Sequence, residues 1–350
     1  MAASNSADRA VSVHRPAWPA RIVGLPDRIP FPRPATYLLL IGAGAVAGLP
    51  VGWFLESYRG GALLLQYAYY GAVPVALLCI MHDLDRQAFR AFDLLAPMLT
   101  FDDEERAAAR ARLVHLPPVP VLVSAAASLL LTFAYYRADP VTTGVEGLSA
   151  ARLLLRWCWE SMTGAMFFVL AVHTVLQLRT IDWIHRRLGE IDLFDQARVR
   201  AFSTVTSRTG IALIIVSSPS ALVLPSEGDL SVVLASIGWL ASVVLVALIS
   251  FALPLWHVRS QIAARKAALQ GEIGRRISEA IASSHAAMDR GDTATVDVQQ
   301  RNLAALTSQR VLVEHVSVWP WSTAASSRLV TAVLLPVCVW FLTRALDRVV

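Results

Sequence analysis

Charged side chains are scarce in this chain of 350 residues. Only 16% of the residues are Asp, Glu, Lys or Arg, whereas 55% are hydrophobic. Soluble proteins carry about 25% charged residues, so the composition argues against an ordinary soluble protein. Lysine is almost missing, because Lys266 is the only lysine among 31 basic residues. We interpret this arginine bias as the mark of a high-GC bacterial coding sequence.

Cysteines and enzyme motifs are also few. The three cysteines, Cys79, Cys158 and Cys338, have spacings that match neither a zinc site nor a redox pair. The chain contains no glycine-rich phosphate loop, no His-Glu-x-x-His and no Gly-x-Ser-x-Gly. We therefore expect no enzyme, no cofactor and no metal. A pI of 9.4 without a basic-aromatic signature predicts no nucleic-acid partner either.

Long apolar runs are the dominant feature that is present. Six of them approach the roughly 17–25 residues that a helix needs to cross a bilayer. They cover residues 37–55, 62–81, 119–136, 157–178, 209–224 and 231–256, and a shorter run covers 329–342. The predicted fold is all-α: a polytopic helical membrane bundle of six or seven transmembrane helices.

Basic residues alternate between the segments that separate these runs. The N-terminal tail 1–36, loops 82–116 and 179–208, and the segment from 257 to Arg328 together hold 25 of them. The intervening loops hold four. By the positive-inside rule this predicts a bacterial inner-membrane protein with a cytoplasmic N-terminus.

The segment 257–318 has a different pattern. Apolar residues recur at three-and-four spacing on both sides of Arg290-Gly-Asp, which predicts a cytoplasmic antiparallel helical hairpin of coiled-coil type. The predicted seam contains Ile262, Leu269, Ile273, Ile277, Ile281, Met288, Val296, Leu303, Leu306, Val313 and Val316. Residues 319–350 form the remaining unit, a short C-terminal membrane helix and tail.

Several polar residues lie within or beside the apolar runs, where charge is costly unless it faces a partner or water. Ser217, Ser218, Pro219 and Ser220 predict a bend in the fifth run, of the kind that lines transporter sites. With Arg328, Glu160 and His173 they are the candidate pore or substrate-path residues. Packing, a pair between Glu160 and Arg156, and snorkelling of Arg328 are the structural alternatives.

Two further groups lie at the predicted inner face. His257, Arg259, Arg265 and Lys266 form a basic collar after the sixth run, suited to anionic lipid head groups. His82, Asp83, Asp85 and His185 form a candidate polar layer, for which a metal site, a pH sensor or ordinary interfacial packing are alternatives. Gly44-x-x-x-Gly48 allows close helix contact, within one protomer or between protomers.

The leading functional hypothesis is an oligomeric channel or transporter, with anions as the first choice of cargo because Arg328 is the strongest intramembrane cation. The alternative is a non-catalytic sensor or scaffold whose hairpin binds a cytoplasmic protein. A membrane-lipid enzyme that uses the inner-face polar layer is the third. Expected partners are membrane lipids, further copies of the chain and a cytoplasmic protein.

Overall fold

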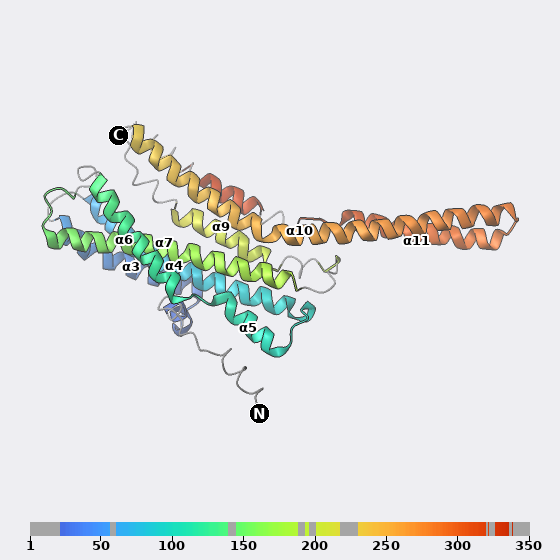
Figure 1. Ribbon diagram of the computed structural model, residues 1–350, viewed down its shortest axis with the longest axis horizontal. Coiled ribbons are helices and arrows are strands. Elements are labelled where there is room, and N and C mark those ends of the chain that lie inside the picture. The colour runs from blue at the N-terminus through green and yellow to red at the C-terminus, as the bar shows by residue number, and fades with distance from the viewer. Residues whose placement is uncertain are drawn as a thin grey trace, which may run out of the picture.

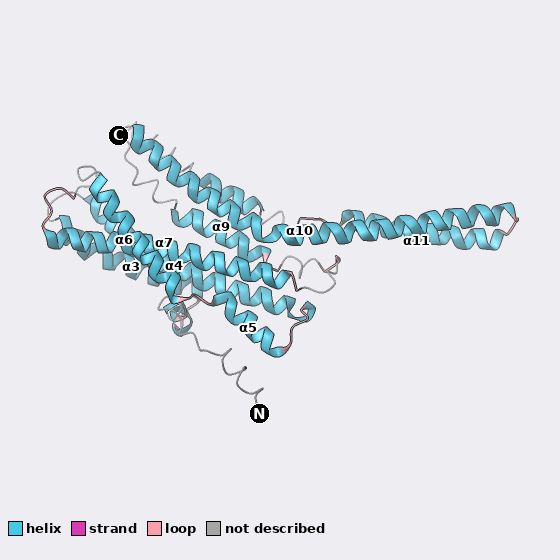
Figure 2. Ribbon diagram, viewed as in Figure 1, coloured by secondary structure: helices cyan, strands magenta, loops and turns pink. Residues whose placement is uncertain are grey.

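The computed structural model is helical throughout the part of the chain that it describes. It describes residues 22–56, 61–138, 145–187, 193–195, 201–217, 230–319, 321, 326–335 and 338. Figure 2 shows helices joined by short turns, and no strand occurs among these residues. The all-α prediction is therefore confirmed.

Seven of the long helices form a bundle with an extension (Figure 1). Their bounds are α3 Arg33–Glu56, α4 Gly61–Leu95, α5 Asp103–Val114, α6 Pro118–Ala138, α7 Ala150–His185, α9 Ser203–Ser217 and α10 Leu230–Asp289. An eighth, α11 Thr293–His315, pairs with the second half of α10. Short 3-10 turns, η1 Leu25–Arg28 and η2 Ala96–Met98, precede α3 and follow α4.

The directions of the packed helices alternate. Thr163 on α7 donates to the carbonyl of Tyr70 on α4 (3.1 Å), and His173 lies 2.9 Å from Asp85 further along the same two helices. Since both residue numbers rise together, α4 and α7 are parallel. Contacts of α3 and α9 with α4, and of α6 with α7, run in the opposite sense. The arginine-rich ends of α4 and α7 consequently lie at one end of the bundle.

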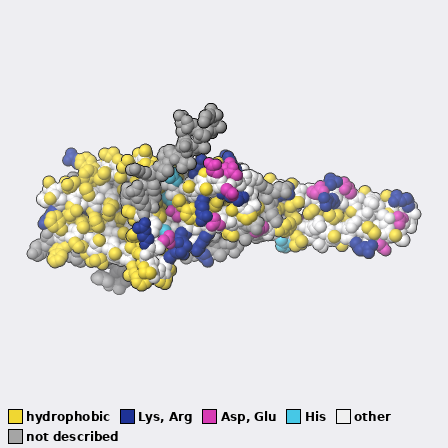
Figure 3. Space-filling view, turned by 90° about the horizontal axis from the view of Figure 1, so that it is seen from below, with side chains coloured by type: hydrophobic (Ala, Val, Ile, Leu, Met, Phe, Trp, Pro, Cys, Tyr) yellow, Lys and Arg dark blue, Asp and Glu magenta, His cyan; other side chains and the backbone are white. Residues whose placement is uncertain are grey.

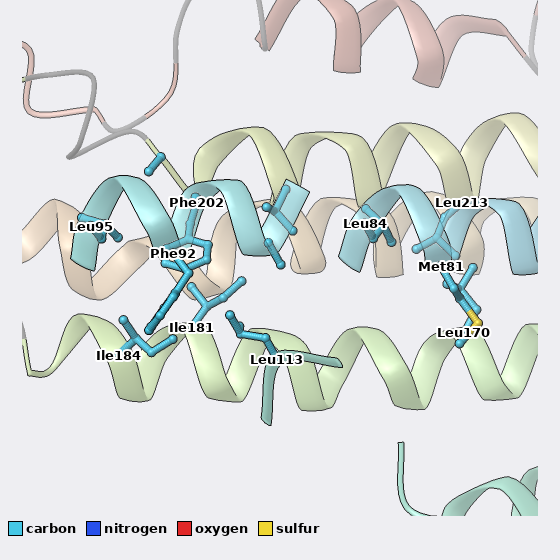
Figure 4. Packing of buried hydrophobic residues seen from close by; sticks show 14 of the residues in the cluster. Met81, Leu84, Phe92, Leu95, Leu113, Leu170, Ile181, Ile184, Phe202 and Leu213 are labelled. Atoms are coloured by element: carbon cyan, nitrogen blue, oxygen red, sulfur yellow. The ribbon is translucent and has the colours of Figure 1, made fainter. Parts of the chain in front are cut away.

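The core of the bundle lies between α4, α7 and α9, as Figure 4 shows. α4 contributes Met81, Leu84, Phe92 and Leu95, and α7 contributes Leu170, Ile181 and Ile184; Phe202, Leu213 and Leu113 complete the labelled set. Most of these side chains lie beyond the ends of the apolar runs at 81 and 178. Helices α4 and α7 therefore continue past the predicted spans, because an apolar stripe still has core to cover there.

Helices α3 and α4 approach each other through glycine. A Cβ atom built on Gly44 would lie 2.6 Å from the carbonyl oxygen of Gly71, and one built on Gly48 would overlap the carbonyl of Tyr67. The small-residue motif therefore serves contact within the protomer. At Gly42, two residues before Gly44, an added Cβ atom would have no neighbour within 4 Å.

Three described segments are long and apolar enough to cross a membrane: Arg33–Leu55, Asp103–Ala138 and Ala150–His185. Ser203–Val216 and Ser326–Leu335 are apolar but shorter. This is fewer than the six or seven crossings predicted, partly because residues 218–229 and most of 336–350 lie outside the described residues. The structure supports membrane association, while the full count stays a prediction.

Helix α10 is continuous for 60 residues, so the predicted boundary at 256/257 falls inside one helix. Its second half extends away from the bundle with α11 beside it (Figure 1). The turn is where the sequence placed it: Gly291 has φ +71°, and Asp292 caps α11 by accepting from the Thr295 amide at 3.1 Å. The Thr295 hydrogen bonds also lower the pKa of the Asp292 carboxyl.

The predicted seam holds over most of the hairpin, because Ile262, Ile273, Val313 and Val316 are buried, and it differs only near the tip of α10. Small residues, Ala280, Ser284 and Ala287, are buried on α10, whereas Ile281 and Met288 are 41% and 54% exposed. Near the tip, the predicted seam at Ile281 and Met288 was displaced by one residue, because large apolar side chains were weighted above alanine. Alanine allows two helices to pack closely, and it leaves the larger side chains outside the contact.

Candidate functional site

The inner-face polar layer centres on one stretch of α4. His82, Asp83 and Asp85 lie there within four residues, and the helix turns about 100° for each residue. Their side chains therefore point to different neighbours. The structure resolves them into three separate contacts.

His82 faces the N-terminal segment. Its Nε2 lies 2.9 Å from Asp27 Oδ2, and its Nδ1 lies 2.7 Å from the Tyr37 hydroxyl. Arg86 donates to the other oxygen of Asp27 at 2.8 Å. The hydrogen bond from His82, followed by the charges of Arg86 and Arg33, lowers the pKa of Asp27. This group ties η1 and α3 to α4.

Asp85 faces α7, and its side chain is 13% exposed. Its Oδ1 accepts from Gln177 Nε2 at 3.3 Å and lies 2.9 Å from His173 Nε2, whose side chain is 2% exposed. Gln177 also donates to the carbonyl of Leu113 at 3.3 Å, which joins the end of α5 to the same group. The Nδ1 of His173 is buried and has no hydrogen-bond partner among the described residues.

The other two members of the layer lie apart. Asp83 accepts from Arg208 on α9 at 2.7 Å. His185 packs edge-to-face on the ring of Phe202, with the centroids 5.3 Å apart. The four residues thus have different partners, and no group of three or more His, Cys, Asp or Glu that fits a metal ion occurs in the described ranges.

The remaining pore candidates have mixed outcomes. Glu160 accepts from Arg156 at 2.9 Å and from the Tyr136 hydroxyl at 2.8 Å, which confirms the pair within α7. Arg328 is exposed on the helix Ser326–Leu335. Ser217 is the last residue of α9, and the predicted bend at Ser218, Pro219 and Ser220 lies outside the described residues.

The basic collar is mostly engaged by the protein. The guanidinium of Arg259 lies over two indole rings, 5.1 Å from the centroid of Trp256 and 4.2 Å from that of Trp319. Lys266 Nζ donates to the carbonyls of Glu314 (2.8 Å) and Val316 (2.9 Å), so the single lysine caps the C-terminus of α11. Arg265 is exposed, and the side chain of His257 lies outside the described part.

The hairpin has two dissimilar sides. Between its arms lies a polar groove of about 490 Å³, whose lining includes Arg276, Glu279, Ser283, Gln299 and Asn302. Large apolar residues are exposed elsewhere on it: Ile281, Met288, Val298, Val311 and Leu312. The charges near its middle pair within α10, as in the 2.7 Å contact of Arg276 with Glu272.

No protein-family model, curated protein or solved structure matches this chain. The arguments about function consequently depend on the geometry alone.

The sequence did not predict the partners of these groups. Asp27 and His82 are 55 residues apart, and Asp85 and His173 are 88 apart. Each residue was visible as a polar interruption near an apolar run. Its partner depends on how α4 is rotated against α3 and α7, and no local pattern encodes that rotation.

Proposed function

We propose that this protein is a membrane-anchored scaffold that binds a cytoplasmic protein through the α10–α11 hairpin. The observation that supports this most is the packing near the tip of the hairpin, where small residues form the seam while Ile281 and Met288 face solvent. Exposed apolar residues on an otherwise charged helix pair are typical of a protein-binding surface. Ile281 and Met288 are seven residues apart, so they lie on one stripe of α10.

The anchor is the helical bundle, for which we propose six or seven crossings with the N-terminus in the cytoplasm. Three segments have the required length and apolarity, and we propose α10, which continues from the sixth apolar run into the hairpin, as a fourth. In Figure 3, hydrophobic side chains cover the part of the visible face away from the hairpin, and charged side chains gather in a band nearer to it. The band includes the arginine-rich loops, and the positive-inside rule therefore favours a hairpin on the cytoplasmic side.

The test compares two pairs of substitutions in the full-length protein purified with its membranes. Ile281→Glu with Met288→Glu places charge on the proposed stripe. Ala282→Glu with Ala286→Glu adds the same charge at exposed positions on the side of α10 turned away from α11. We expect the wild type to capture a protein that the first pair of substitutions loses and the second pair retains. That captured protein, once purified, should bind the wild type directly. Identical capture by both pairs would refute the scaffold.

A conduit is the second candidate, and the buried group of Asp85, His173 and Gln177 favours it. A carboxylate and an imidazole enclosed between membrane helices are typical of ion and proton pathways. This proposal predicts ionic flux in proteoliposomes, reduced by Asp85→Asn and by Arg328→Ala. Proteoliposomes without flux, or flux that neither substitution changes, would remove it.

A further inference from the structure

A pocket of about 250 Å³ lies where α5, the start of α6 and the end of α7 meet. Its lining includes Arg112, His115, Leu176, Arg179, Thr180 and Trp183. Helix α5 ends at Val114 and α6 starts at Pro118, so the short connection between them closes one side. None of these residues belongs to the polar layer or to the hairpin.

The two arginines of this pocket differ from their neighbours in charge pairing. Arg106, Arg110, Arg186 and Arg187 each lie within 4.0 Å of a carboxylate. Neither Arg112 nor Arg179 forms an ion pair with any described residue. Arg112 instead lies over the ring of Trp183, 5.2 Å from its centroid, which orients the guanidinium without neutralising it. The pocket therefore holds uncompensated positive charge suited to an anion.

An apolar surface continues from the pocket along the bundle. Val175 is exposed one turn before Arg179 on α7, and Phe168 lies two turns earlier on the same face. On α6 the first turn exposes Val119, and Leu122 follows it. A ligand with one anionic end and long apolar chains would match both parts.

We propose that this pocket binds the phosphate group of an anionic membrane lipid, whose acyl chains lie along the exposed faces of α6 and α7. The guanidinium groups of Arg112 and Arg179 donate hydrogen bonds to the phosphate, because their planar forks match phosphate oxygens. A soluble phosphate shares this chemistry, but it would leave the apolar surface unused. The inference depends on the membrane location in the proposed function, and not on the hairpin partner.

The experiment titrates the full-length protein, in an uncharged detergent, with dioctanoylphosphatidylglycerol, dioctanoylphosphatidylcholine and inorganic phosphate. Bound lipid is counted by native mass spectrometry. Arg112→Gln with Arg179→Gln removes the proposed donors, and Arg110→Gln with Arg186→Gln removes the same charge outside the pocket, from α5 and from the residue that follows α7. Arg112→Lys with Arg179→Lys keeps the charge, and melting temperatures without lipid show whether each variant is folded.

We expect the wild type to prefer phosphatidylglycerol, and the Gln pair in the pocket to weaken its binding by about 25-fold, at about fivefold for each cation. The control pair should keep the wild-type affinity, and the Lys pair most of it. Equal binding of phosphatidylcholine, or an unchanged affinity of the pocket Gln pair, would overturn the inference. Inorganic phosphate that binds as tightly as the lipid would overturn it in favour of a soluble anion.

The membrane proposal has its own readout, so the two failures are distinguishable. A protein that alkaline carbonate extracts from membranes would refute the anchor itself. A protein that resists extraction but shows no preference for the anionic lipid would refute only the pocket.

Discussion

The glycine contact between α3 and α4 gives the sharpest test of the bundle. In Gly48→Ala the new methyl group would overlap the main-chain carbonyl of Tyr67, and no rotamer change can move a carbonyl. The helices must separate instead, and overpacking of this kind costs about 1–3 kcal/mol. Gly42→Ala adds the same methyl group on the same helix where nothing lies within 4 Å. The preference of a helix for alanine over glycine, up to about 1 kcal/mol, applies at both positions.

The two variants should consequently differ by about 1–3 kcal/mol in the free energy of unfolding, with Gly48→Ala the less stable. Unfolding by sodium dodecyl sulfate, followed by tryptophan fluorescence, measures that difference in detergent. Because both substitutions have identical chemistry, a general effect of alanine on α3 cancels. If the two variants unfold at the same detergent fraction, the close approach of the helices is wrong.

Three further predictions concern single polar contacts. Lys266→Met removes the cap of α11; it should destabilise the hairpin by about 1–2 kcal/mol and speed amide exchange in the last turn of α11, and unchanged exchange would contradict the cap. Glu160→Gln leaves Arg156 partly buried without its charge partner and should cost about 3 kcal/mol in the same unfolding assay, against a negligible cost if the pair is solvated. Asp27→Asn removes the carboxylate that contacts His82. The stability that this carboxylate contributes is fully present above its ordinary pKa of 3.8 and is lost as the pH falls through its lowered pKa in the folded state. The stability gap between wild type and Asp27→Asn should therefore narrow below pH 3.8, and a gap that is constant with pH would argue against the lowered pKa.

The sequence predicted the elements of the fold much better than their contacts. Helical character follows from composition and period, and Gly291 marked the hairpin turn through its need for positive φ. Helix ends were harder to predict. α4 continues to Leu95 because Phe92 and its neighbours still cover core after the apolar run has ended.

Side-chain partners were mostly beyond the reach of the sequence. The pair of Arg156 and Glu160 was predicted because it lies within one helix, one turn apart. The partners of His173 and Lys266 come from other helices, so they depend on packing angles that composition does not determine. The hairpin seam was predicted correctly at Ile262, Ile273 and Val313 but not at the tip, where two stripes of α10 share the 3.5-residue period and only contact with α11 chooses between them.

The continuity of α10 has a mechanical consequence. From Lys266, where the end of α11 is fastened to it, to its last residue, Asp289, α10 extends about 35 Å without a joint. A tilt of about 10° at the membrane would carry the hairpin tip through about 6 Å over that length. Small changes in bilayer thickness or in lipid packing that tilt α10 would therefore produce a larger displacement at the hairpin tip, and a protein bound there would move with it.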